Sequence, residues 1–237
     1  MKVIAASLIG ILMFCSCDSN QDEERNPLQL GFTVKRTTDI DALDLSGVTH
    51  IEGGVHILFT ESSDLEFLSN VKSIGENLII FANQSLTSLE GLRSLERVKS
   101  IEISNNYNLK NLDILEDLII EENLKISKNI VSDLPLIGTT SLKNLTIDEP
   151  EIKHVDFLQN ILEIRGELAI VNSDSLKNLD GLSNLNTIGS EVHIENNGSL
   201  IDFCGLKQSL ENSSLRKFEI KGNASNPSRV DIVNECD

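Results

Sequence analysis

The feature that most constrains this chain is a repeat of about 23 residues that recurs through most of its 237 residues. Each unit has a short stretch of alternating apolar and polar residues, a polar turn, and then apolar residues at three-residue steps. LIIFANQSLTSLEGLRSL (78–95) and LAIVNSDSLKNLDGLSNL (168–185) are two such units. The first apolar residues of successive alternating stretches lie 23, 23, 23, 23, 21, 23, 24 and 26 positions apart; they are Phe32, Val55, Leu78, Ile101, Leu124, Leu145, Leu168, Val192 and Phe218. A fixed period of this length predicts a solenoid.

The two parts of the repeat predict different local structures. Alternation at i and i+2 places both apolar side chains on one face of a strand. Apolar steps of three suit tight turns or short 3₁₀ structure better than an amphipathic α-helix. Because a single coil cannot bury its apolar side, the coils must stack. We therefore expect a mainly β solenoid of about eight or nine coils of ~23 residues, with little α-helix.

Turn residues recur at the same coil positions. Asn tolerates left-handed backbone and bonds neighbouring amides, which suits a sharp corner after each strand. Gly before the strands predicts the opposite corner, with positive φ. Recurrence at coil spacing favours a scaffold role for both over ligand contact. The asparagines are Asn83, Asn105, Asn106, Asn129, Asn172, Asn196, Asn197 and Asn223, and the glycines are Gly54, Gly75, Gly166 and Gly189.

One coil departs from this pattern. Residues 145–167 form a unit two residues short, and Asp148, Glu149 and Pro150 replace the usual Asn corner. Because Pro cannot donate to a strand ladder, a bulge or local break is expected there.

The units ENLIIFANQSLTSLEGLRSLERV and GELAIVNSDSLKNLDGLSNLNTI resemble the leucine-rich receptor L-domain family, over residues from about 53 to 237. The closing stretch from FCGLKQSL also resembles the end of bacterial domains of this kind, which occur in Bacteroidota-type lipoproteins. The resemblance implies a right-handed, β-helix-like solenoid. Ligands of that family use the broad sheet face, which implies contacts at Leu58, Ile79, Phe81, Glu102 and Ser104.

The first residues have the character of an export signal. A basic start precedes an apolar run over 3–14 that is too short to span a bilayer, and Ser16-Cys17 follows. The segment resembles a bacterial lipoprotein signal, which implies cleavage before Cys17 and acylation of its thiol. An ordinary secretory signal or a membrane-anchoring helix is the alternative.

The acidic run over 18–24 predicts a flexible tether. It resembles the surface-export signal of Bacteroidota-type lipoproteins, which implies an outer-membrane, cell-surface location. Asp18 leaves open retention at the inner membrane, as in enterobacteria. We divide the chain into a signal peptide (1–17), an acidic tether (18–31) and a solenoid (32–237), with an N-terminal partial coil or cap (32–54) and a C-terminal cap (211–237).

Two cysteines remain beyond the signal, Cys204 and Cys236. An exported chain lies in a compartment that permits disulfides, so we expect this pair to fasten the C-terminal cap to the last coil. Two free thiols or half of a metal site are the alternatives.

Charge and missing motifs exclude several classes of function. The 20 Lys and Arg against 37 Asp and Glu give a net charge of -17, which argues against nucleic acid and anionic lipid as ligands. The chain has no nucleophile elbow, zinc-protease helix motif, phosphate-binding loop or calcium loop. Its four histidines are scattered. We therefore expect a non-enzyme without a cofactor or metal.

The outward sheet face is the most informative surface. Most alternate strand positions carry polar residues, but Leu58, Ile79 and Phe81 bring three large apolar side chains together on neighbouring coils. Such a patch marks an interaction site, unless residues 27–50 fold back over it. With no Trp and only Tyr107, protein partners rank above glycans.

The resulting expectation is a cell-surface binding module for protein recognition or adhesion. A periplasm-facing scaffold and an accessory glycan-binding lipoprotein for nutrient capture are the alternatives. The oligomeric state is left open.

Overall fold

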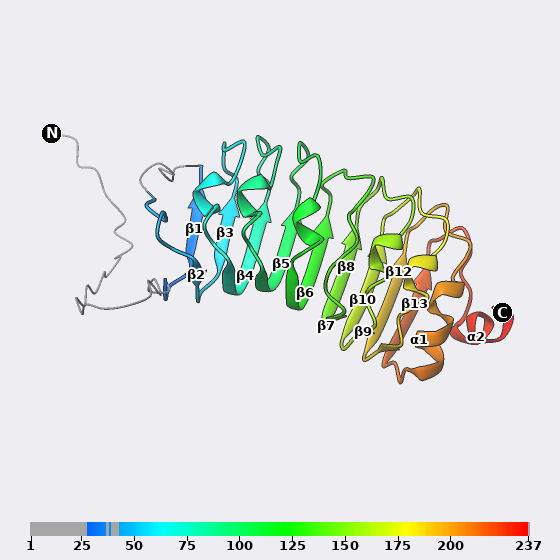
Figure 1. Cartoon of the computed structure of the whole chain (residues 1–237). Coiled ribbons are helices and arrows are strands. Elements are labelled where there is room, and N and C mark those ends of the chain that lie inside the picture. The colour runs from blue at the N-terminus through cyan, green and yellow to red at the C-terminus, as the bar shows by residue number, and fades with distance from the viewer. Residues whose placement is uncertain (1–27, 37, 39–42, 237) are drawn as a thin grey trace.

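The computed structural model describes residues 28–36, 38 and 43–236. They form an elongated stack built on a ten-stranded parallel sheet, and Figure 1 shows the strands side by side from the blue to the red end. Along the sheet lie β1 (Phe32–Lys35), β3 (Val55–Leu58), β4 (Ser73–Phe81), β5 (Arg97–Ser104), β6 (Ile119–Ser127), β8 (Asn144–Asp148), β10 (Glu167–Val171), β12 (Glu191–Glu195) and β13 (Lys217–Lys221).

The register of this sheet follows the period in the sequence. Val55 pairs with Leu78, and Leu78 pairs with Ile101. The coil that is two residues short keeps the same alignment, because Leu145 pairs with both Leu124 and Leu168. These aligned residues point inward and are buried from β3 to β12, as predicted. Mainly β architecture, with the core running along the stack, is confirmed.

A second face of the stack carries shorter strands. β7 (Ser141–Leu142), β9 (Glu163–Ile164) and β11 (Thr187–Ile188) form a three-stranded parallel sheet, and β2 (His50–Ile51) pairs with the start of β4. The register between β4 and β5 shifts between Ile74 and Asn77, which is where the chain turns from one face to the other.

The glycines near this corner do not have the predicted positive φ; among the described glycines only Gly222 does. These glycines instead allow the backbones of successive coils to approach closely. A Cβ on Gly75 would lie 2.6 Å from the Glu52 carbonyl oxygen, and one on Gly189 would lie 2.0 Å from that of Arg165. Coils therefore stack here too closely for any side chain.

Short 3₁₀ turns occupy the return path, as the three-residue apolar steps predict. They are η2 (Glu66–Leu68), η3 (Glu90–Leu92), η4 (Asp113–Leu115), η5 (Asp156–Leu158), η6 (Asp180–Leu182) and η7 (Cys204–Leu206). In the coil of η3, Leu86, Leu89 and Leu92 are buried. Gly91 lies against the preceding coil, where a Cβ would be 2.2 Å from Leu65 backbone atoms.

The predicted corner amides do bond from coil to coil. Asn83 Nδ2 donates to Asn106 Oδ1 (3.1 Å), and Asn106 Nδ2 donates to Asn129 Oδ1 (3.0 Å). Asn197 makes the same bond to Asn223 (2.9 Å). In the coil between, buried Ser173 takes the ladder position, and its N–H donates to Asn197 Oδ1 (2.9 Å). Asn172 lies just before it at the corner, with the predicted left-handed φ (55°).

Strand pairing runs through the coil of Pro150 without a bulge, so of the bulge or break predicted there only an interruption in the run of corner amides is seen. β8 ends at Asp148, before Pro150, and pairs with β6 through Asp148. Glu149 replaces the Asn, and its carboxylate accepts from Asn129 N and Ile130 N (2.8 and 2.9 Å). A longer side chain therefore fills the corner of the shorter coil.

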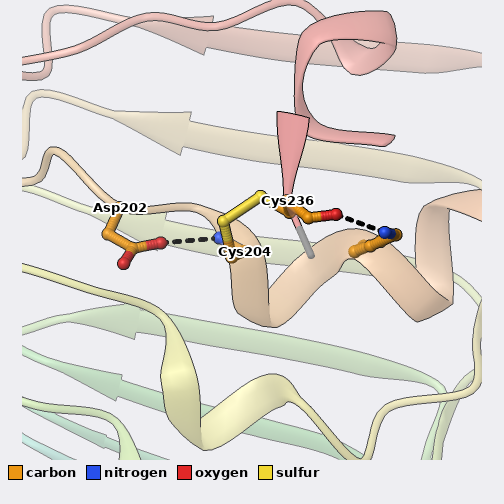
Figure 2. The surroundings of a disulfide bond; sticks show 4 residues. Asp202, Cys204 and Cys236 are labelled. Atoms are coloured by element: carbon orange, nitrogen blue, oxygen red, sulfur yellow. Dashed lines mark hydrogen bonds between the residues drawn. A yellow bond between two sulfur atoms is a disulfide. The ribbon is translucent and has the colours of Figure 1, made fainter. Parts of the chain in front are cut away.

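The C-terminal end is capped by α1 (Lys207–Asn212) and α2 (Arg229–Glu235). Cys204 and Cys236 form the predicted disulfide, with Cα atoms 5.3 Å apart. Figure 2 shows the bond between Cys204, in the η7 turn that leads into α1, and Cys236 near the chain end, with Cys204 N donating to Asp202 (2.9 Å). The Lys207 ammonium donates to the Cys236 carbonyl oxygen.

The folded domain begins before residue 32. Leu28 forms a parallel bridge with Ile51 and packs on the core, so the end of the predicted 18–31 tether belongs to the fold. Within the described part of the chain, no helix is both long and apolar enough to cross a membrane. The predicted signal peptide and Cys17 lie outside the described residues.

Candidate functional site

The three apolar side chains predicted to share the outward face are neighbours. Leu58 pairs with Phe81 across β3 and β4, and Ile79 lies two residues before Phe81 on the same face. All three are half-buried. They form what we call the apolar patch: Leu58, Ile79 and Phe81.

Residues 27–50 do not close over this patch in the part that the structure describes. β1 pairs alongside β3 and so lengthens the sheet instead of crossing its outward face. Phe32 packs on the core, whereas Leu30 is 68% exposed. Residues 27, 37 and 39–42 lie outside the described residues.

The structure separates the two polar residues predicted beside the patch. Glu102 pairs with Ile79 in register, and its carboxylate contacts Lys125 Nζ (3.0 Å). Ser104 is only 1% exposed and donates its hydroxyl to Glu102 (2.9 Å). Direct ligand contact by Ser104 was therefore a wrong prediction: a small side chain beside Phe81 is covered by its neighbours.

Phe59 is the aromatic residue that the sequence patterns missed. It directly follows β3, is 55% exposed, and its ring lies edge-to-face against Phe81, with centroids 5.3 Å apart. Because the alternation of β3 ends at Leu58, it does not predict which way the Phe59 side chain points. Alignment of the corner positions could have found it, because the equivalent residues are Ala82 and Asn105.

A shallow pocket adjoins this aromatic pair at the carboxyl end of β3 and β4. Its volume is about 390 Å³, and Phe59, Gln84 and Ser85 contribute to its lining. Arg36 and Glu61 also line it, and Arg36 Nε lies 3.0 Å from Glu61 Oε1 in an exposed ion pair. The site thus combines an aromatic wall with planar polar groups.

The C-terminal part of the same face carries charge instead. His193 Nδ1 lies 3.2 Å from Glu195 and 3.4 Å from Glu219. Hydrogen bonds from Lys217 and Lys221 lower the pKa of Glu219 to about 2, so it stays ionised. The ligand atoms are close enough for a cation, but the two ammonium groups would compete with it. We assign no metal site to this cluster.

The arrangement of coils, sheet face and cap agrees with the comparison to known proteins. The family model described as Receptor L domain matches residues 47–134 and 119–220, together well over half of the chain. The chain therefore belongs to the receptor L domain family. No curated protein and no solved structure shows a significant match to it.

Proposed function

We propose that this protein is a non-catalytic recognition module that binds an extracellular protein through the apolar patch. The observation that supports the proposal is the patch itself: clustered large apolar side chains on a mostly polar sheet face are typical of interaction surfaces. Phe59 and Phe81 add rigid aromatic surface, which loses little entropy on binding.

The proposal includes the location and the finer geometry. The protein is a Bacteroidota-type lipoprotein, exported by residues 1–17, anchored in the outer membrane through acylated Cys17, and exposed on the cell surface. Its coils wind right-handed, about eight or nine in number. An anchor and a solenoid of this length hold the sheet face away from the membrane.

Photo-crosslinking on intact cells tests the binding role. A photoreactive residue at position 79 samples the patch, and one at Thr146 is the matched control, because Thr146 lies in the same outward row three strands along. We expect discrete protein adducts from position 79 alone. Identical adduct patterns from both positions would mean that the patch is not the binding surface.

The alternatives differ in their partners. A periplasm-facing scaffold would cross-link to envelope proteins. An accessory nutrient-binding lipoprotein would bind glycan, and the pocket beside Phe59 favours that candidate enough to examine it separately.

A further inference from the structure

Phe59 occupies a backbone position that disfavours it. The residue after most strands of the main sheet adopts left-handed φ, between 54° and 70°. Gly populates this region freely and Asn tolerates it, whereas a bulky residue there is strained. The residues at these corners are Phe59, Ala82, Asn105, Lys128, Asn172, Asn196 and Gly222.

Burial does not compensate for the strain at Phe59. Its side chain remains 55% exposed, and Phe81 is its aromatic partner, with ring planes 83° apart. The fold would be at least as well served by Asn at this corner. Strained residues cluster at functional sites, and unlike Ile130, which is also exposed with positive φ, Phe59 lines a pocket, so it is a candidate for ligand contact.

Polar groups beside Phe59 are arranged for hydrogen bonding. Arg36 and Glu61 form their ion pair on one side of the 390 Å³ pocket. Gln84 Nε2 donates to the Asn105 carbonyl oxygen (2.9 Å), which orients the amide. Among the described residues, none donates a hydrogen bond to Gln84 Oε1. The lining of the pocket therefore includes an amide, a guanidinium and a carboxylate.

These features define the chemistry of a ligand. An electron-rich aromatic face attracts C–H groups. Planar guanidinium, carboxylate and amide groups bind pairs of neighbouring hydroxyls. Arg36 and Glu61 neutralise each other, so the pocket offers no net charge to an ionic ligand. Its volume is at the small end of the range for small-molecule sites, about 300–1,000 Å³.

We propose that the pocket walled by Phe59 binds the ring of a neutral sugar, as a subsite for an extracellular glycan. The sugar stacks its C–H face on Phe59, while Gln84 and the Arg36–Glu61 pair bind its hydroxyls. This activity goes beyond the protein recognition proposed above. Ile79→Asp alters the apolar patch without changing the pocket lining, so the two proposals can fail separately.

Saturation-transfer NMR on the detergent-solubilised full-length protein tests the site. The probes are the methyl glycosides of glucose, galactose, mannose, fucose and N-acetylglucosamine at millimolar concentration, with N-acetylneuraminic acid as the charged comparison. We expect at least one neutral glycoside to bind, and Phe59→Asn to weaken it about tenfold or more. Gln84→Ala should weaken the same glycoside about threefold to tenfold.

The variant is chosen to separate binding from folding. Because Asn suits the left-handed corner, Phe59→Asn should melt at or above the wild-type temperature. Ile130→Asn is the matched control: Ile130 also has positive φ (62°) and is 51% exposed, but it does not line the pocket. It should bind the sugar like the wild type.

Three results would overturn the proposal: no neutral glycoside binds, binding survives Phe59→Asn unchanged, or the charged sugar binds best. Loss of protein cross-links in Phe59→Asn without any sugar binding would assign Phe59 to the protein interface instead.

Discussion

The Asn129 side chain donates through Nδ2 to Glu149 Oε1 at 2.8 Å, which ends the first run of corner amides on a buried carboxylate. The side chain of each Asn in the run accepts a hydrogen bond from the preceding coil and donates one to the following coil. The carboxyl oxygens of Glu149 accept from Asn129 and Ile130, and among the described residues the Glu149 side chain bonds to none in the next coil, so the run ends there. The ladder begins again at Ser173, whose backbone N–H donates to Asn197 Oδ1 (2.9 Å).

Glu149 should make stability depend on pH. Burial raises its pKa above the ordinary 4.5, although hydrogen bonds from Asn129 and Ile130 oppose the shift. A raised pKa means that Glu149 binds its proton more tightly in the folded state than in the unfolded chain. The contribution of this protonation to the free energy of unfolding is therefore fully present below pH 4.5. It is lost as the pH rises through the pKa of Glu149 in the folded state.

We expect the free energy of unfolding of the wild type, relative to Glu149→Gln, to fall as the pH rises above 4.5. The total fall is about 1.4 kcal/mol for each tenfold increase in the proton affinity of Glu149 on folding. Urea unfolding of both proteins at several pH values measures it. Parallel stability curves for the two proteins would show that Glu149 does not titrate differently in the fold.

Asn106→Ala should destabilise the fold by about 3 kcal/mol, because it leaves several buried polar groups without partners. Asn106 Nδ2 donates to Ile80 O (2.9 Å) and Asn129 Oδ1, and Oδ1 accepts from Asn83 N (3.0 Å). Exposed Asn108→Ala is the control. Equal urea midpoints for the two variants would mean that the ladder contributes little.

Gly181→Ala should be among the most destabilising alanine substitutions, costing about 3 kcal/mol or more through steric overlap. Its Cβ would lie 1.9 Å from the Val155 carbonyl oxygen. The matched variant is Gly198→Ala, where the nearest atom is the Asp174 side-chain Oδ1 at 3.1 Å. Thermal unfolding compares them, and similar melting temperatures would contradict close coil stacking.

Reduction of the Cys204–Cys236 disulfide should lower the melting temperature. The bridge closes a loop with a sequence separation of 32. The chain-entropy model gives about 3–4 kcal/mol for a loop of this size. Melting with and without reductant measures the effect, and the Cys204→Ala/Cys236→Ala variant should be insensitive to reductant. If the wild type melts identically in both conditions, the bridge does not stabilise the cap.

Sequence periodicity predicted the register of the sheet because inward positions must be apolar in every coil, as at Leu78 and Ile101. It could not predict the burial of Ser104, which depends on the sizes of Phe81 and other neighbours across strands. It also missed Phe59, since alternation carries no information beyond the end of a strand. The sequence showed that the usual Asn is missing near Glu149. It did not show that the longer Glu149 side chain accepts the hydrogen bonds from Asn129 that an Asn accepts in other coils.

The glycine corner shows a similar limit. Gly75 and Gly189 suggested positive φ because they recur at the corner before the strands, but the constraint comes from backbone atoms of the preceding coil. The contacts that matter join residues 23 or 24 positions apart, and a local sequence pattern carries no information about them.

Surface labelling of intact cells tests the central claim of cell-surface recognition most directly. A membrane-impermeant amine reagent can reach exposed lysines on the sheet face, such as Lys125 and Lys217, whose side chains are about half exposed. Lysed cells and a known periplasmic protein serve as controls. The account predicts equal labelling of this protein before and after lysis, while the periplasmic control is labelled only after lysis. Protection of both proteins until lysis would place the solenoid inside the envelope and contradict recognition at the cell surface.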